Sequence, residues 1–105
     1  MPNFDLLIRR AIKDRRLLAI EYQRRSRAVE PHDYGVAGGK TRLLVYQLTA
    51  IPARGRDLGW RLLDVEKLDR CEILDQTFAG GRGDAHPSHH VWEKVFARVT
   101  PAAKT

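Results

Sequence analysis

Arginine and aromatic side chains share the predicted strands of this chain, and together they have the chemistry to hold phosphate groups. Arg27, Arg42 and Arg61 lie in stretches with strand-like patterns, and Tyr46 lies between the last two. Guanidinium groups donate paired hydrogen bonds to phosphate, and aromatic rings stack on nucleic acid bases. The pattern therefore predicts an anion-binding surface at these four residues. The alternative is that Tyr46 packs in the core and the arginines only decorate the surface.

The charge balance favours the same kind of partner. The sequence has 19 Lys and Arg residues against 13 Asp and Glu, which gives a formal net charge of +6. Most of the basic residues are arginines, whose planar guanidinium groups bind phosphate in pairs of hydrogen bonds, so polyanionic partners are favoured. A basic composition that merely keeps the surface soluble is the alternative.

Few residues have the types and spacing that an enzyme needs. Cys71 lies within an apolar strand pattern, where a free thiol is usually an inert core residue. Asp64 and Glu66 are two residues apart, and we interpret them as solvated charges or as salt-bridge partners for Arg61 and Lys67. We therefore expect no catalytic residues and no enzymatic activity.

A metal site is not indicated either. His86, His89 and His90 cluster near the C-terminus, but the Cys ligands of a structural zinc site and the HExxH helix of a metalloprotease are both missing. Gly38-Gly39 and the glycines of residues 80–83 match no phosphate-binding glycine motif. We expect exposed histidines, no metal and no cofactor.

The single cysteine and the hydropathy pattern indicate where the protein works. One cysteine, Cys71, excludes an internal disulfide and fits the reducing cytoplasm. No apolar run approaches the roughly 20 residues of a membrane span. Charges at Asp5, Arg9 and Arg10 interrupt the N-terminal stretch that a signal peptide would need. We expect a cytoplasmic protein without a membrane partner.

Apolar periodicity predicts one helix followed by strands. Residues 4–16 have apolar positions at helical spacing, and Asn3 can cap the start of that helix. From residue 17 to about residue 76 the apolar residues alternate, as in about five short strands. Pro31 indicates an edge or a bend, and Gly38-Gly39 indicates a tight hairpin turn.

The spacing of these strands predicts a small five-stranded barrel, a fold that is mostly β (α+β). Residues 41–50 are apolar on both faces, with Leu43 and Val45 on one and Leu44 and Tyr46 on the other. Such a strand is buried on both sides, between a barrel interior and a covering helix.

A second helix is predicted near the C-terminus. The Gly-rich residues 75–84 should be irregular, and Ser88 can cap a helix over about residues 89–99. Its apolar face would consist of Val91, Trp92, Val95, Phe96 and Val99. The whole chain, residues 1–105, then forms one domain.

Four segments resemble, in order and in amino-acid sequence, the conserved segments of a known family. Residues 11–22, AIKDRRLLAIEY, are similar to the opening helix and first strand of WYL domains, and RAVEPHDYG over 27–35 resembles the next conserved segment. LVYQL over 44–48 falls where the naming Trp-Tyr-Leu tripeptide lies, and WRLLDVEKL over 60–68 resembles a later segment. The resemblance covers about residues 4–78.

This resemblance implies an Sm-like or SH3-like barrel with an N-terminal helix and a ligand-binding regulatory role. WYL domains are usually joined to a DNA-binding helix-turn-helix and are thought to sense nucleic acid or nucleotide-like ligands through a basic pocket. Matching residue by residue carries this role to Arg27, Tyr46 and Arg61, and Arg42 is added because of its strand position. No residues remain for a helix-turn-helix, so we expect a free-standing WYL-like domain rather than a one-chain transcription factor.

Two functional hypotheses follow. The first is a non-enzymatic regulatory module, active in transcriptional regulation, that binds single-stranded nucleic acid or a nucleotide-like ligand. The second is a protein-interaction or oligomerisation module, because small β domains often associate through edge strands. A homo-oligomer is compatible with both.

Overall fold

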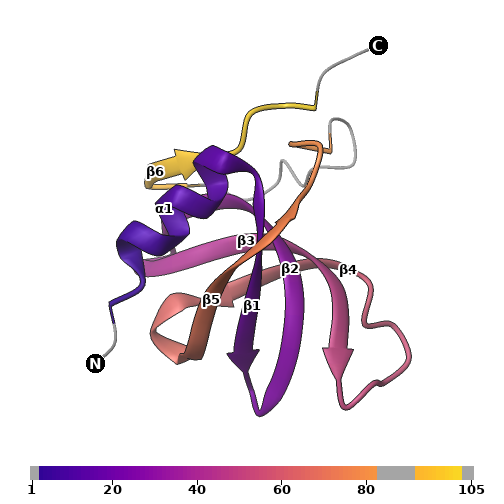
Figure 1. Ribbon diagram of the computed structural model, residues 1–105. Helices are drawn as coiled ribbons and strands as arrows, with labels where there is room; N and C mark the ends of the chain where they lie inside the picture. Colours follow the sequence, from indigo (N-terminus) through magenta and orange to yellow (C-terminus); the bar gives the residue numbers. More distant parts are fainter. Residues whose placement is uncertain (1–2, 83–91, 103–105) are drawn as a thin grey trace.

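The computed structural model describes residues 3–82 and 92–102 of the chain. One helix, six strands and a short 3₁₀ turn are present in that part, and every strand pair is antiparallel (Figure 1). In chain order the elements are α1 (Asp5–Asp14), β1 (Arg16–Tyr22), β2 (Arg25–Ala37), β3 (Lys40–Ile51), β4 (Gly59–Asp64), η1 (Val65–Lys67), β5 (Leu68–Thr77) and β6 (Lys94–Arg98).

The N-terminal helix forms as predicted but is shorter than residues 4–16. The side chain of Asn3 accepts a hydrogen bond from the backbone amide of Asp5 at 2.9 Å, which satisfies a free amide at the start of α1. Arg15 has a φ of 52°, and this left-handed residue ends the helix so that Arg16 can begin β1. The buried face of α1 consists of Ile8, Ala11 and Ile12.

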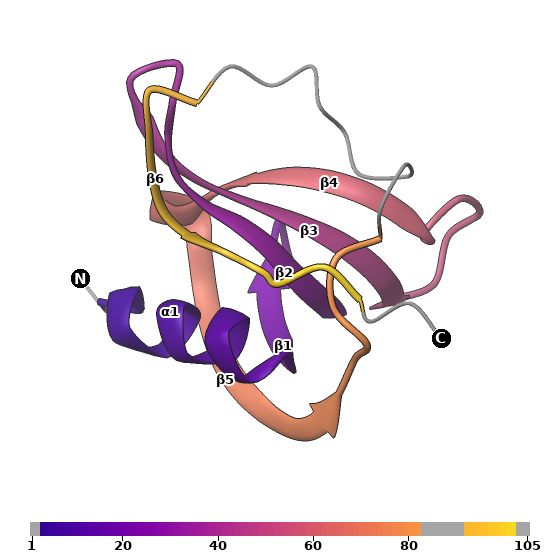
Figure 2. The same cartoon turned by 90° about the horizontal axis from the view of Figure 1, so that it is seen from above.

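The helix is fixed to the sheet by polar contacts as well as by its apolar face. The Tyr34 hydroxyl donates to the Asp5 carboxylate at 2.7 Å, and Arg9 Nη1 donates to the Phe96 carbonyl oxygen at 3.3 Å. α1 therefore packs against both β2 and β6, as Figure 2 shows. No helix within residues 3–82 and 92–102 is long and apolar enough to cross a membrane.

The strands form a bent sheet in the order β4-β3-β2-β1-β5, with β6 added to β2. β1 pairs with the first half of β2, from Arg25 to Val29, and β6 pairs with its second half, from Asp33 to Val36. A register shift separates the halves after Pro31, so the predicted bend is confirmed. The predicted Gly38-Gly39 turn is also confirmed, because both glycines have positive φ angles of 62° and 74°.

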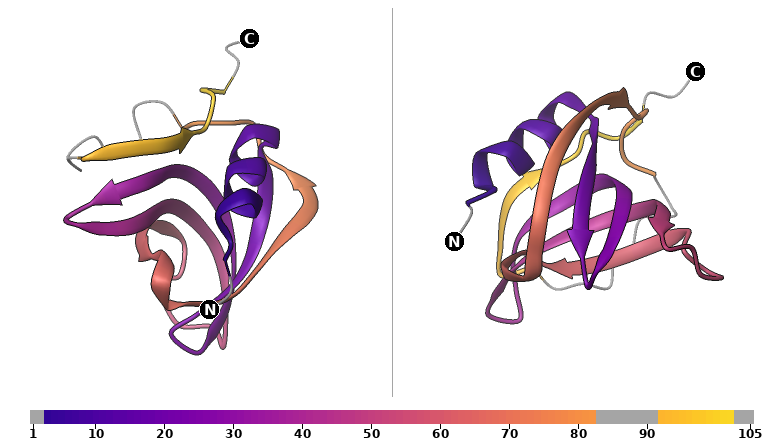
Figure 3. Two further views of the ribbon diagram at one scale, coloured as in Figure 1. Left: turned by 90° about the vertical axis from the view of Figure 1, so that its left-hand side faces the viewer. Right: turned by 60° about the horizontal axis from the view of Figure 1, so that its bottom comes forward.

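The prediction of a closed five-stranded barrel is wrong. Within the described residues, β4 pairs only with β3 and β5 only with β1, so the two outer strands do not meet and the sheet stays open (Figure 3). The chain passes between these edges through η1 alone. Side chains of α1, namely Ile8, Ala11 and Ile12, contribute to the core beside those of the sheet.

The prediction of a C-terminal helix over residues 89–99 is wrong for its described part. Residues 83–91, with Ser88 and the three clustered histidines, lie outside the described residues, and Lys94–Arg98 forms strand β6. The helical spacing of the apolar residues is real, but the second half of β2 offers an unpaired edge. Tertiary pairing with that edge outweighs the local pattern.

The core lies on the inner face of the bent sheet. The alternation predicted for β1 is confirmed, with Leu18, Ile20 and Tyr22 buried. Burial on both faces of β3 is confirmed by Leu43 and Leu44, which are both buried. The core cluster consists of Ile8, Ala11, Ile12, Leu18, Ile20, Tyr22, Val29, Tyr34, Leu43, Val45, Leu63, Leu68, Cys71 and Val99.

Replacing Gly35 with alanine should weaken the pairing of β2 with β6. A Cβ atom on Gly35 would lie 2.0 Å from the Lys94 carbonyl oxygen, so β6 would have to move. We expect Gly35→Ala to lower the free energy of unfolding by about 2 kcal/mol in urea titrations. Gly55→Ala is the control, because a Cβ there meets open space. Equal stability of the two variants would contradict this pairing.

Candidate anion-binding site

A cavity of about 350 Å³ opens at the end of the sheet that lies away from α1. Its walls come from the turn between β1 and β2, the loop after β3, and β4; the turn and the loop lie at the lower edge of Figure 1. We name it the arginine pocket after Arg25, Arg27, Arg54 and Arg61. The other lining residues are Tyr22, Gln23, Leu62 and Leu63.

The strand periodicity explains why polar side chains gather here. Alternate residues of a strand point to the same face, so the inner face of each strand can be followed two residues at a time. On three adjacent strands this face changes from apolar to polar towards the pocket, from Val29 to Arg27 on β2, from Val45 to Gln47 on β3, and from Leu63 to Arg61 on β4.

Arg27 is buried in the pocket, with 8% of its surface exposed, the same fraction as Arg25. Its Nη1 donates to Gln47 Oε1 at 3.0 Å, its Nη2 donates to the Tyr22 carbonyl oxygen at 3.0 Å, and its guanidinium lies 5.3 Å from the Tyr22 ring. Its Nε is buried without a hydrogen-bond partner, and no carboxylate of the described residues forms an ion pair with it. Burial, and then the nearby Arg25 and Arg61, lower the pKa of Arg27.

Arg25 carries the one ion pair made by the lining arginines within the described residues. Its Nη2 lies 2.6 Å from Oδ1 of Asp57, and the same guanidinium donates twice to the Pro52 carbonyl oxygen. The Arg54 amide donates to the other oxygen of Asp57 at 2.7 Å. The Arg54 amide and the Arg25 guanidinium together lower the pKa of the Asp57 carboxyl. Because Asp57 neutralises only Arg25, the other three lining arginines leave the pocket with a net positive charge.

Arg61 of the pocket and the neighbouring Gln47 hold the loop of residues 52–58. Arg61 Nη2 donates to the Arg56 carbonyl oxygen at 2.6 Å, and Gln47 Nε2 donates to the Asp57 carbonyl oxygen. Arg56 has a φ of 68°, a left-handed conformation that a non-glycine residue adopts at some cost. The loop therefore depends on contacts with pocket side chains.

The structure brings two of the four predicted ligand-binding residues together. Arg27 and Arg61 both line the arginine pocket, whereas Arg42 lies near the other end of β3, where its Nε donates to the Ala37 carbonyl oxygen at 3.1 Å. Sequence reasoning missed Arg25 and Arg54. The period of two from Arg27 would have indicated Arg25, but nothing in the sequence fixes where the loop places Arg54.

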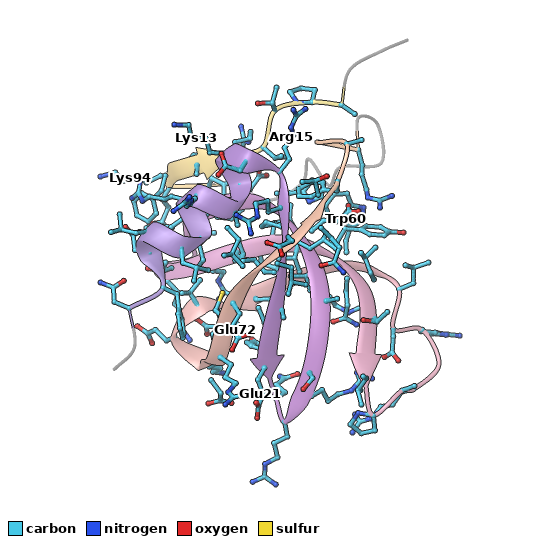
Figure 4. The ribbon with its side chains drawn as sticks, viewed as in Figure 1. Lys13, Arg15, Glu21, Trp60, Glu72 and Lys94 are labelled. Carbon is cyan, nitrogen blue, oxygen red and sulfur yellow. The ribbon has the colours of Figure 1, made fainter. Side chains whose placement is uncertain are left out.

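Tyr46, the fourth predicted residue, points to the opposite face of β3 from Gln47. The Arg82 guanidinium lies 3.6 Å from its ring centroid, and Trp60 packs edge-on against it at 5.3 Å. Arg82 also forms two hydrogen bonds with Glu30, at 2.8 and 3.0 Å. The outer face of β3 is thus covered at Tyr46 by side chains rather than by the predicted helix. Figure 4 shows Trp60 well away from Glu21, which marks the pocket end of β1.

Cys71 and Asp64, the residues considered for catalysis, lie in surroundings that indicate a structural role. Cys71 lies in the core, as predicted, and burial raises the pKa of its thiol to about 12, which keeps it protonated. Asp64 is buried and lies 3.6 Å from Lys40, not beside the predicted Arg61 or Lys67. Within residues 3–82 and 92–102, no group of three or more His, Cys, Asp or Glu side chains has a metal-binding arrangement.

Comparison with family models, with curated proteins and with solved structures finds no match to this chain. The case for a function therefore rests on the arginine pocket and its neighbouring residues.

Proposed function

We propose that this protein is a non-enzymatic regulatory module that binds single-stranded nucleic acid or a nucleotide-like ligand through phosphate groups held in the arginine pocket. The observation that carries the proposal is the surroundings of Arg27. This guanidinium is buried beside two further arginines and forms no ion pair with a carboxylate of the described residues. Burying a charge without a counter-ion is costly, and a phosphate would supply the missing negative charge.

The size and lining of the arginine pocket limit the kind of ligand. A volume of about 350 Å³ lies at the lower end of the range for small-molecule sites and has room for a phosphate with its sugar. Among the described residues Tyr22 is the one aromatic ring that lines the pocket, and the Arg27 guanidinium already lies 5.3 Å from that ring. Recognition would therefore depend on phosphate contacts, which position a nucleic acid without reading its sequence.

The proposal agrees with the role that the resemblance to WYL domains implies, and it changes the expected contacts. Arg25 and Arg54 join Arg27 and Arg61, while Arg42 and Tyr46, the other two predicted ligand-binding residues, lie outside the pocket and mark the alternative place for a ligand. Transcriptional regulation in the cytoplasm is the setting that we propose from the same resemblance and the single cysteine.

Fluorescence anisotropy with labelled single-stranded DNA and RNA across a salt series tests this function. We expect affinity that falls steeply with salt, because bound phosphates release counterions. Arg61→Ala should weaken binding by about tenfold, the loss expected for one charge-assisted contact. Arg42→Ala removes the same charge outside the pocket and should change affinity by less than about threefold. No binding at low salt would refute the proposal.

Oligomerisation is the second candidate function, and an open sheet edge favours it. Among the described strands β4 pairs only with β3, and the loop before β4 exposes Leu58 by 62%. An unpaired edge beside apolar side chains can pair with a second copy of the chain. Sedimentation of the same samples separates the two functions. A mass that rises with protein concentration at any salt, without nucleic acid binding, would favour oligomerisation.

A further inference from the structure

One arginine that lines the arginine pocket, Arg25, is already paired with a carboxylate of the chain itself, that of Asp57. Asp57 places one carboxylate oxygen 2.6 Å from Arg25 and the other 2.7 Å from the Arg54 amide. The paired side chains of Arg25 and Asp57 are 10% and 16% exposed, so this contact is largely shielded from solvent. An incoming anion that accepts from Arg25 Nη2 must therefore compete with the Asp57 carboxylate.

The position of Asp57 is coupled to the rest of the pocket through its loop. Gln47 donates to the Asp57 carbonyl oxygen and, through its Oε1, accepts from Arg27, while Arg61 donates to the neighbouring Arg56 carbonyl oxygen. The side chains that fasten the loop are thus the ones that surround the buried guanidinium. Displacement of the Asp57 carboxylate would therefore also affect the hydrogen bonds that Gln47 and Arg61 make with this loop.

Building on the proposed function, we propose that Asp57 determines the specificity of the pocket by competing for Arg25, so that phosphate monoesters bind more tightly than singly charged groups. A tethered carboxylate acts at an effective concentration of about millimolar or more. When a singly charged ligand replaces Asp57 at Arg25, it exchanges one ion pair for an equivalent one, so little binding free energy is gained. A phosphate monoester carries a charge of about −1.5 to −2 and three terminal oxygens, so it can bridge Arg25 and a second arginine.

The ligand class that follows is a nucleotide or an oligonucleotide with a phosphate at its end. An internal phosphodiester has a single charge and two free oxygens, so it competes with Asp57 less well than a terminal phosphate. The wild-type protein should bind a labelled oligonucleotide with a 5′- or 3′-phosphate about tenfold more tightly than the same sequence with hydroxyl ends.

Asp57→Asn tests the competition directly. We expect this variant to bind the hydroxyl-ended oligonucleotide about tenfold more tightly than the wild type, because the competing charge is gone, and to lose most of the preference for a terminal phosphate. In an Arg25→Gln background the same substitution should give no gain, since the contested guanidinium is absent. Glu21→Gln is the matched control, because it removes one negative charge from β1 at a residue that does not line the pocket.

The outcomes separate this inference from the function on which it rests. Equal wild-type binding of both oligonucleotides would overturn the role of Asp57 and leave the anion-binding function intact. A gain in Asp57→Asn that persists in the Arg25→Gln background, or that Glu21→Gln reproduces, would show a general charge effect and overturn the competition. Failure of every variant to bind either oligonucleotide would refute the proposed function as well.

Discussion

Replacing Arg54 and Arg61 together with alanine should lower the affinity for single-stranded nucleic acid by about a hundredfold or more at low salt. Each guanidinium can donate a charge-assisted hydrogen bond to phosphate, worth about 1.5–3 kcal/mol, and both line the same cavity. Removing two phosphate contacts should also reduce the slope of log affinity against log salt by about 1.4 for a single-stranded ligand. Anisotropy titrations at several salt concentrations measure both quantities.

A second double variant shows whether position matters more than charge. Arg42→Ala with Arg70→Ala also removes two positive charges, but Arg42 lies near the far end of β3, and Arg70 lines a neighbouring groove that has only Arg27 in common with the arginine pocket. We expect this variant to lose less than about threefold in affinity. If both double variants weaken binding equally, the ligand responds to overall charge and the arginine pocket is not its site.

Replacing Leu43 with alanine should lower the free energy of unfolding by about 3 kcal/mol. Leu43 is fully buried on the inner face of β3, where it lies opposite Tyr34 on β2 and Leu63 on β4. A Leu→Ala change in such a core removes apolar burial and leaves a cavity, which costs about 2–5 kcal/mol. That is a large part of the roughly 5–15 kcal/mol that stabilise a domain of this size.

The matched substitution Leu6→Ala controls for the loss of leucine itself. Leu6 lies on the outer side of α1 and is 81% exposed, so its removal should change stability by less than about 0.5 kcal/mol. Urea unfolding of both variants measures the difference. Similar losses for Leu43 and Leu6 would contradict the placement of β3 at the centre of the core.

Local patterns predict those parts of the fold that local chemistry determines. The alternation of Leu18, Ile20 and Tyr22 predicts β1 because one face of that strand is buried. Both glycines of the Gly38-Gly39 turn adopt the positive φ angles that their lack of a side chain permits, as the hairpin prediction required. Pro31 marks the bend in β2 because proline cannot donate to a strand ladder.

Features that depend on distant partners are not predictable in this way. β6 forms because the second half of β2 has an open edge, and Gly35 lets the two backbones approach closely. The helical spacing of its apolar residues carries no information about that edge. Closure of the sheet likewise depends on whether β4 reaches β5, which no local pattern determines.

The candidate site shows the same limit. Arg27 and Arg61 were predicted from strand position and from the WYL resemblance, and the structure places both in one pocket. Arg54 and Asp57 come from a loop whose course follows from hydrogen bonds to Arg25, Gln47 and Arg61. Polar loop composition predicts a loop but not which of its side chains turns back towards the sheet.

Whether the ligand binds in the arginine pocket can be tested by an NMR titration that follows the arginine side-chain Nε–H signals as a single-stranded oligonucleotide is added. Ligand binding in the arginine pocket predicts that the signals of Arg25, Arg27, Arg54 and Arg61 shift together while that of Arg42 stays in place. Shifts confined to Arg42, or to Arg82 beside Tyr46, would place the ligand elsewhere and refute binding in the arginine pocket.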